Sequence, residues 1–174
     1  SLPCVLSWLL EALPDQQQTF PEGFSGGIAH RLDISTSGLL WVARSLGALE
    51  RMRAHFREGR LRKSYQFLTA RAVPWREHEL TAALAHHPRR KSRMVHQRGR
   101  NTAHRGRWYP AQTSLSQLDA WRWRADISTG VMHQIRVHAA SAGLALAGDQ
   151  IYGGGRLRPS LLAAGVDFAL HHQG

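Results

Sequence analysis

An aspartate, a tyrosine and an arginine stand in three polar segments that are far apart in the sequence. Asp33 lies in a polar turn before an apolar run, a position rigid on one side and open on the other, which suits a catalytic carboxylate. Tyr65, two residues after Lys63, can present a flat ring and a hydroxyl together. An arginine such as Arg136 keeps a neighbouring carboxylate ionised and oriented. These residue types suit a site built around an ionised carboxylate.

Each of these residues also has a purely structural interpretation. Asp33 can accept hydrogen bonds from the backbone of its own turn, as aspartate often does. Tyr65 can be a core aromatic residue, the commoner fate of a strand tyrosine, and Arg136 can belong to a surface ion pair. For Asp33 alone the structural interpretation is favoured, so the case for chemistry depends on the three segments occurring together.

The elements that must position these residues mix helices and strands without a regular βαβ repeat, which favours an α+β domain. The apolar run at 37–43 is typical of a buried strand. Ser45 can cap a helix that Gly59 ends, and its apolar stripe is predicted to be core. That stripe contains Leu46, Leu49, Met52 and Phe56. The remaining predicted elements are a helix at 5–13, a strand at 61–73, a hairpin of 111–118 with 121–127, and a helix at 131–142 with Gly143 as its C′ residue.

The charge of the chain indicates a polyanionic partner. The 174 residues fit one domain and carry a net charge of +11 with a pI near 11.4. RNA, DNA and anionic membranes all match that sign. No apolar run approaches the ~18 residues of a membrane helix, and no strongly basic amphipathic helix stands out, so we expect no membrane contact. A single cysteine, Cys4, favours a reducing cytoplasm.

A basic middle segment is the best candidate for contacting nucleic acid. No acidic residue occurs between Glu79 and Asp119. Its cations include Arg89, Arg90, Lys91, Arg93, Arg98, Arg100, Arg105 and Arg107, with His86, His87, His96 and His104 interleaved. Arginines grip phosphates and release counterions, which predicts salt-dependent binding. The alternative is a mobile, solvated loop. The histidine spacings match no standard zinc site, so no metal is expected.

Together the segments resemble the RluA-type pseudouridine synthases of ribosomal and transfer RNA. That family has a His-Arg-Leu-Asp-x-x-Thr-Ser-Gly-Leu-Leu stretch, matched throughout by residues 30–40, and a Lys-x-Tyr element, matched by residues 63–65. Its Thr-Gly-Arg-Thr-His-Gln-Ile-Arg-Val-His element is similar to residues 129–138, and its Gly-Asp-x-x-Tyr-Gly element to residues 148–153. Several motifs in the right order are far more specific than any one of them.

The resemblance implies a role for each matching residue. Asp33 would be the catalytic carboxylate that acts as nucleophile, or as base in a competing scheme, while the uracil is cut from its ribose and rejoined through carbon. Arg136 would pair with Asp33, and Tyr65 would stack on the target uracil and help in the final proton removal. Arg31 would fill the gap left by the flipped nucleotide, and Ile135 would pack by the site. The expected RNA-binding residues are Arg31, Lys63, Ile135, Arg89, Arg90, Lys91 and Arg93.

The resemblance also implies the fold and the working state. We expect an α+β pseudouridine synthase fold: a mixed, mainly antiparallel bent sheet flanked by helices, with a basic RNA-binding cleft. Because the isomerisation is redox-neutral and adds no external group, no cofactor is expected. The predicted protein is a cytoplasmic monomer that acts on ribosomal or transfer RNA. Flipping a base out of its stack costs a few kcal/mol, which contacts from a basic surface can offset.

Two departures from the family pattern affect these expectations. Val131 and Met132 replace the usual arginine and threonine, which predicts altered RNA affinity more than lost chemistry. The expected organisation is a single catalytic domain over 1–174 that lacks the family's first and last strands. Two other hypotheses remain open: a non-catalytic RNA-binding or ribosome-assembly protein of the same fold, and a basic DNA-binding domain, for which no helix-turn-helix or zinc finger is recognisable.

Overall fold

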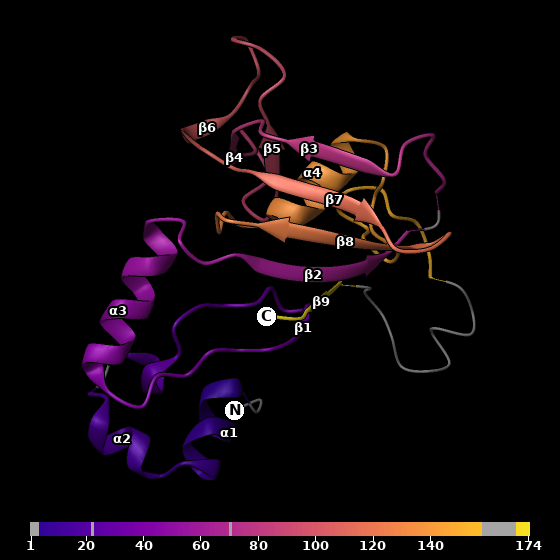
Figure 1. Ribbon diagram of the computed structural model, residues 1–174. Helices are drawn as coiled ribbons and strands as arrows, with labels where there is room; N and C mark the ends of the chain where they lie inside the picture. The colour runs from indigo at the N-terminus through magenta and orange to yellow at the C-terminus, as the bar shows by residue number, and fades with distance from the viewer. Residues whose placement is uncertain (1–3, 22, 70, 158–169) are drawn as a thin grey trace. The chain divides into compact units, whose positions relative to one another are not determined.

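A computed structural model of the chain describes residues 4–21, 23–69, 71–157 and 170–174 (Figure 1). The described residues form two compact units. One unit is drawn from residues 1–32 and 39–60, and the other from residues 33–38 and 61–174.

Helices dominate the first unit. It contains α1 (Val5–Ala12), α2 (Asp15–Thr19), a 3₁₀ turn at Ser25–Gly27 and α3 (Leu46–Arg57). Helix α3 begins where the sequence predicts, because the Ser45 hydroxyl accepts a hydrogen bond of 3.3 Å from the backbone N–H of Ala48. It ends as predicted at Gly59, which adopts φ 66°. Of the predicted stripe, Leu49 is fully buried, whereas Leu46 is 39% exposed.

The prediction of a buried strand at 37–43 is wrong for most of that run. Only β1 (Ser37–Gly38) is a strand, and it pairs in parallel with β9 (Leu170–His172). Gly38 has φ 121°, and a Cβ there would overlap the His172 backbone, so the glycine permits the close pairing. The chain then enters the other unit, where Leu39 and Trp41 are 54% and 40% exposed. The apolar residues at 39–43 therefore belong to the first unit, and the run does not cross one core as a single strand.

A six-stranded sheet forms the larger part of the second unit, with strand order β1-β9-β2-β8-β7-β3. Its longer strands are β2 (Lys63–Leu68), β3 (Glu77–Leu80), β7 (Thr113–Gln117) and β8 (Arg122–Ile127), which lie side by side in Figure 1. Every pair is antiparallel except β1 with β9. The predicted hairpin of β7 and β8 is confirmed, and so is the α+β class with a mainly antiparallel sheet.

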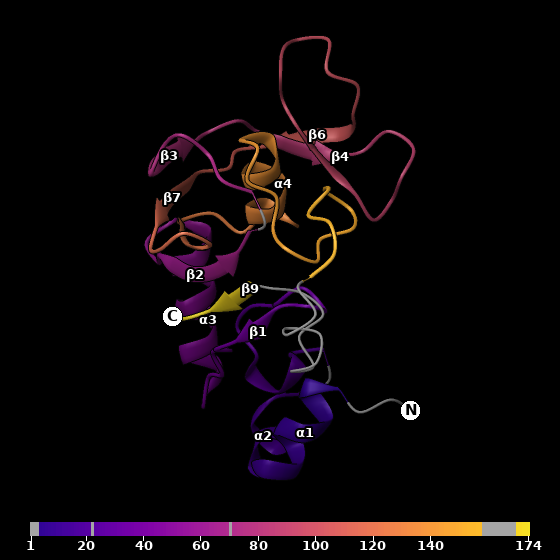
Figure 2. The same cartoon turned by 90° about the vertical axis from the view of Figure 1, so that its right-hand side faces the viewer.

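The basic middle segment folds into a second, three-stranded sheet that the sequence analysis missed. Its strands are β4 (Leu84–His86), β5 (Met94–His96) and β6 (Arg105–Tyr109), in the order β5-β4-β6. Figure 2 shows the loops that join these strands projecting away from β4 and β6. Leu84 and Met94 are buried, at 0% and 2% exposed, which anchors the sheet to the core. The alternative of a mobile, solvated loop is therefore wrong for these three strands.

Helix α4 (Gln134–Ser141) packs between the two sheets of this unit. Val137 joins Leu84, Met94 and Ala111 in one core cluster. The helix ends before Gly143, as predicted, but it starts three residues later than the predicted 131, because His133 adopts a left-handed conformation with φ 55°. Across the described residues, no helix is long and apolar enough to cross a membrane.

Candidate active site

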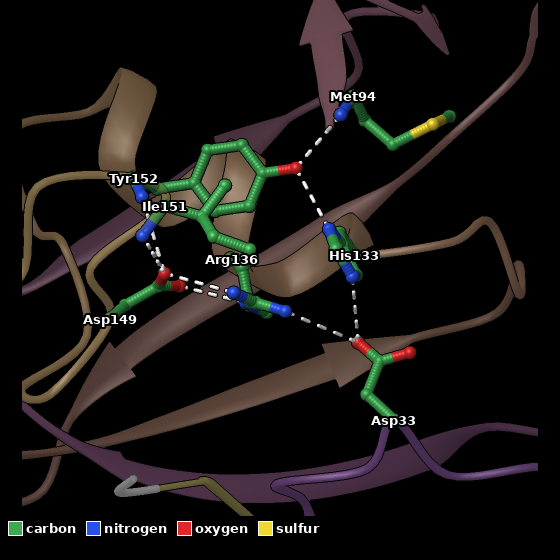
Figure 3. Close-up of polar contacts among 7 residues, drawn as sticks. All are labelled: Asp33, Met94, His133, Arg136, Asp149, Ile151 and Tyr152. Atoms are coloured by element: carbon green, nitrogen blue, oxygen red, sulfur yellow. Dashed lines mark hydrogen bonds and ion pairs between the residues drawn. The ribbon is translucent and has the colours of Figure 1, made fainter. Parts of the chain in front are cut away.

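Asp33 is the first residue of a tight turn in the second unit. Its backbone carbonyl closes the turn by accepting a hydrogen bond of 2.8 Å from the N–H of Thr36. The side chain is 24% exposed, and its Oδ2 lies 3.8 Å from Arg136 Nη1 and 3.8 Å from His133 Nε2 (Figure 3). The carboxylate is thus directed at two nitrogen groups of the α4 region while part of it stays accessible to a substrate.

Arg136 is held mainly by a different carboxylate, that of Asp149. The pair is bidentate, with Nε to Oδ2 at 2.7 Å and Nη2 to Oδ1 at 2.9 Å. Both side chains are buried, with Arg136 8% and Asp149 1% exposed. Burial tends to lower the pKa of Arg136, but the hydrogen bonds and charge of Asp149, aided by Tyr152 and Asp33, outweigh it and raise that pKa. The guanidinium therefore stays charged, and its third nitrogen is directed at Asp33.

The loop after α4 is built to hold Asp149. Its Oδ1 also accepts hydrogen bonds from the backbone N–H groups of Ile151 (3.0 Å) and Tyr152 (3.2 Å), and its own carbonyl accepts from Gly154 at 2.7 Å. A Cβ on Gly154 would overlap the carbonyl of Leu146, so only glycine fits there. Sequence reasoning matched this motif but gave Asp149 no role. A carboxylate between motif glycines was the available signal.

Tyr65 lies on β2 and is 7% exposed. Its ring lies 4.6 Å from that of His172, measured between centroids. Burial, and to a lesser extent the negative charge of Asp33, raises the pKa of Tyr65 to about 12. The phenol is therefore neutral at physiological pH, so in this state it donates hydrogen bonds and does not act as a base.

Gln134, which was not singled out from the sequence, locks the entry to α4. Its side-chain amide donates to the carbonyl of Gln112 at 2.8 Å and to the hydroxyl of Thr113 at 3.1 Å. Its Oε1 accepts from the hydroxyl of Thr129 at 2.8 Å and from the N–H of Val131 at 3.1 Å. These four hydrogen bonds fix the segment that carries His133 and Arg136.

Val131 and Met132, the two departures from the family motif, are partly buried. Both pack against the core cluster that includes Leu84, Met94 and Val137. Apolar side chains at these positions therefore add to the core between α4 and the three-stranded sheet. This packing gives the departures a structural role.

The predicted RNA-binding residues lie in different surroundings. Ile135 is 4% exposed, which suits packing by the site but leaves little surface for direct contact with RNA. Lys63 is half-buried in β2, where burial lowers its pKa, and its Nζ lies 3.0 Å from the position that a Cβ on Gly130 would take. Arg31 is exposed and belongs to the first unit. The remaining four cations, Arg89, Arg90, Lys91 and Arg93, follow β4.

Three of these cations, Arg89, Arg90 and Arg93, line a concave surface that encloses about 1130 Å³. The surface lies between the loops of the three-stranded sheet and α4, and its lining includes His87, Arg89, Arg90, Arg93, Arg98 and Tyr152. Arg89, Arg90 and Lys91 are exposed, while the Arg93 guanidinium lies 5.5 Å from the centre of the Tyr152 ring. Among the described residues, no group of three or more His, Cys, Asp or Glu side chains is placed to hold a metal ion.

The family model for RNA pseudouridylate synthase matches residues 9–141, so the chain belongs to that family. Ribosomal large subunit pseudouridine synthase D of Haemophilus ducreyi is 33% identical over 138 residues, covering 76% of this chain and 39% of that protein. A chloroplastic RNA pseudouridine synthase 2 of Oryza sativa is 34% identical over 135 residues, covering 74% of this chain and 29% of that protein. The chain thus spans less than half the length of these relatives.

Solved structures support the fold. The chain resembles human RNA Pseudouridylate Synthase Domain Containing 1 with a TM-score of 0.68 at 24% identity, covering 83% of this chain and 61% of that one. It resembles human RNA Pseudouridylate Synthase Domain Containing 4 with a TM-score of 0.65 at 21% identity, covering 98% of this chain and 73% of that one. The expected pseudouridine synthase fold is thereby confirmed.

Proposed function

We propose that this protein isomerises uridine in structured RNA, ribosomal or transfer, to pseudouridine, with Asp33 as the essential carboxylate. The observation that carries the proposal is the placement of Asp33, partly open to solvent, 3.8 Å from a buried and charged Arg136. Family membership supports the same reaction. An ionised carboxylate beside a fixed cation is preorganised to attack or to accept a proton without first rearranging its surroundings.

The reaction needs no external reagent. The bond between N1 of uracil and C1′ of ribose breaks, and a bond between C5 and C1′ forms. N1 gains a proton, and C5 loses one. Asp33 acts as nucleophile or as base in the first part, and the Arg136 guanidinium, 3.8 Å away, orients its carboxylate. Because the balance closes without oxidant, reductant or group donor, we propose that no small-molecule cofactor takes part.

Tyr65 is proposed to hold the flipped uracil. Its ring, carried by a central strand, supplies a rigid flat surface for stacking. Its neutral phenol, with the pKa raised to about 12, can donate to Asp33 or to an oxygen of the base. For the phenol to remove the proton from C5, its pKa would first have to fall, for example when Asp33 loses its negative charge during the reaction.

The basic segment is proposed to bind the RNA backbone. Arg89, Arg90 and Lys91 are exposed beside the concave surface next to α4, in a stretch of sequence without acidic residues. Phosphate contacts there would offset the few kcal/mol that base flipping costs. Arg31, Lys63 and Arg93 are proposed to add to this binding. We further propose that the protein acts as a monomer in the cytoplasm.

Pseudouridine mapping tests the proposal. RNA from cells with and without the protein would be mapped, and the deletion strain would be complemented with wild type or with Asp33→Asn. We expect at least one site to disappear on deletion and to return with wild type alone. A site that returns equally with Asp33→Asn would contradict the proposed role of Asp33, and an unchanged map would contradict the proposed activity.

A further inference from the structure

A chain of polar contacts leads from strand β5 to Asp33 (Figure 3). The backbone N–H of Met94 donates to the Tyr152 hydroxyl at 2.8 Å, and that hydroxyl lies 2.9 Å from His133 Nδ1. On the other side of the same ring, His133 Nε2 lies 3.8 Å from Asp33 Oδ2. We propose that Tyr152 and His133 are positioning residues that present an Nε2–H to Asp33 and select which of its oxygens reacts. The inference rests on the proposed isomerase function.

The protons in this chain can be assigned from the groups at its two ends. A backbone N–H can only donate, so the Tyr152 oxygen accepts from Met94. An ionised Asp33 has no proton to give, so the histidine must present a donor, Nε2–H, to it. A neutral imidazole carries one N–H, which leaves Nδ1 as an acceptor for the Tyr152 hydroxyl proton. With a neutral imidazole, one arrangement of the protons satisfies the contacts of this chain.

Tyr152 is suited to the donor role. Burial is the main cause that raises its pKa to about 12, so the hydroxyl keeps its proton at physiological pH. The guanidinium of Arg136 lies 5.2 Å from the ring centre and that of Arg93 lies 5.5 Å from it. Both cations help to hold the ring in place. Arg93 belongs to the basic segment, so this ring joins the segment to the site.

The backbone at His133 is consistent with a functional role for its ring. The residue has φ 55° and ψ 22°, a left-handed conformation that is uncommon outside glycine. It occupies the N-cap position of α4, yet its side chain makes no capping hydrogen bond to that helix. The ring instead lies between Tyr152 and Asp33, and the plane of the histidine ring makes an angle of 87° with that of the tyrosine ring. The uncommon backbone conformation thus goes together with a side chain that lies between those two groups and does not cap the helix.

The contacts to Asp33 distinguish its two carboxylate oxygens. His133 Nε2 and Arg136 Nη1 both approach Oδ2. Two nitrogen groups on one oxygen stabilise negative charge there and fix the plane of the carboxylate. Oδ1 is then the oxygen that attacks the substrate or accepts its proton. At 3.8 Å the histidine contact is longer than a hydrogen bond, so we expect it to shorten when RNA binds.

Histidine tautomers, read from ¹⁵N chemical shifts, test the proton assignment without any assay of activity. The protein would be labelled with ¹⁵N-histidine, and the His133 signals among the 11 histidines would be assigned from their loss in His133→Gln. We expect His133 to carry its proton on Nε2 in the wild type. In Tyr152→Phe we expect a mixture of tautomers, because the donor to Nδ1 is gone. A wild-type His133 protonated on Nδ1 alone would overturn the relay.

Single-turnover kinetics test the consequence for the reaction. The substrate would be a stem-loop transcript of a mapped site that carries tritium at C5 of the target uracil. Release of this tritium reports isomerisation. Tyr152→Phe should lower the rate constant about tenfold, as loss of an orienting partner typically does, with RNA affinity within about twofold. His133→Leu should lower the rate constant further. His133→Gln keeps an N–H donor, so its rate constant should lie between those of His133→Leu and wild type. His78→Gln, on the edge strand β3, is the matched control and should react like wild type.

A double-mutant cycle separates a relay from two independent effects. If Tyr152 acts through His133, then Tyr152→Phe should change the rate little in the His133→Leu background, which has no polar group at this position. Melting temperatures of all variants would be compared, since removing the Tyr152 hydroxyl also deprives the Met94 N–H of its acceptor. An undiminished tenfold effect in the double variant would overturn the relay. A wild type that releases no tritium would instead overturn the proposed isomerase function, and the tautomer measurement would still decide the relay.

Discussion

Two groups of arginines in the second unit carry the same charge in opposite surroundings. Arg136 is 8% exposed and is gripped by Asp149 through hydrogen bonds of 2.7 and 2.9 Å. Arg89 and Arg90 are exposed in a stretch that contains no acidic residue. A cation paired in the core has a fixed geometry, which suits chemistry, whereas an exposed one stays hydrated and is available to a phosphate. The free energy of unfolding and the reaction rate should therefore depend on Arg136, and the affinity for RNA on Arg89 and Arg90.

Removing the partner of the buried arginine should have the largest effect on stability. Asp149→Asn leaves Arg136 buried without its bidentate carboxylate, so the free energy of unfolding should fall by about 3 to 5 kcal/mol. Urea denaturation measures this change. Asp126→Asn removes the partly exposed pair with Arg124, 3.0 Å apart, and should cost no more than about 1 kcal/mol. Equal losses for the two variants would contradict the expected difference between a buried and a partly exposed ion pair.

Neutralising exposed cations should change affinity and its salt dependence. Replacing Arg89 and Arg90 by glutamine should raise the Kd for RNA about tenfold and reduce the slope of log K against log salt by about 0.7 to 0.9 for each phosphate that is no longer neutralised. Filter binding at several salt concentrations gives both values. The double variant Arg51→Gln with Arg57→Gln has the same net charge but lies on α3. If this control lowers affinity equally, binding follows net charge and not the basic segment.

Much of this contrast could be read from the sequence, but its geometry could not. The residues proposed for the site, Asp33, Tyr65 and Arg136, could be singled out from the sequence because they occur in ordered motifs. Their pairing depends on long-range packing: Asp149 takes the two short hydrogen bonds of Arg136, and Asp33 only a 3.8 Å contact. The position of Asp149 between motif glycines marked it as a candidate, but no local pattern shows that its carboxylate pairs with Arg136 and not only with its own turn.

The secondary structure shows the same division. Strand β2 and the hairpin of β7 and β8 were predictable, because buried and exposed side chains alternate along them. The three-stranded sheet was missed because β4 and β5 have three residues each, too few to show a period, and lie among arginines and histidines. The run at 37–43 misled for another reason: the chain changes unit after Gly38, and the apolar residues at 39–43 form no continuous strand in the first unit, so tertiary context outweighed local preference.

The smallest effect expected is the response of the buried core to acid. His138 is fully buried, with Nε2 2.8 Å from the carbonyl of Ala82 and Nδ1 2.8 Å from the hydroxyl of Thr113. Burial is the main cause that lowers its pKa below the usual 6.5. The unfolded chain then binds this proton more readily, so the stabilisation is present above pH 6.5 and is lost as the pH falls below it.

Thermal unfolding between pH 7.5 and pH 5.5 measures this response. A single group contributes at most about 1.4 kcal/mol per pH unit, so we expect a decrease of a few degrees in melting temperature toward pH 5.5. His138→Gln should be less stable at pH 7.5 but should lose less on acidification. An equal acid dependence in this variant would assign the effect to other groups.

The central claim is that Asp33, beside the buried Arg136, does the chemistry and that the exposed cations bind the RNA. Single-turnover kinetics at increasing RNA concentration test this claim most directly. For Asp33→Asn we expect the maximal rate constant to fall at least about 1000-fold, with the half-saturating RNA concentration within about twofold of wild type. For Arg89→Gln with Arg90→Gln we expect the reverse: a wild-type maximal rate reached only at about tenfold more RNA. An Asp33→Asn protein that keeps the wild-type maximal rate would contradict the account.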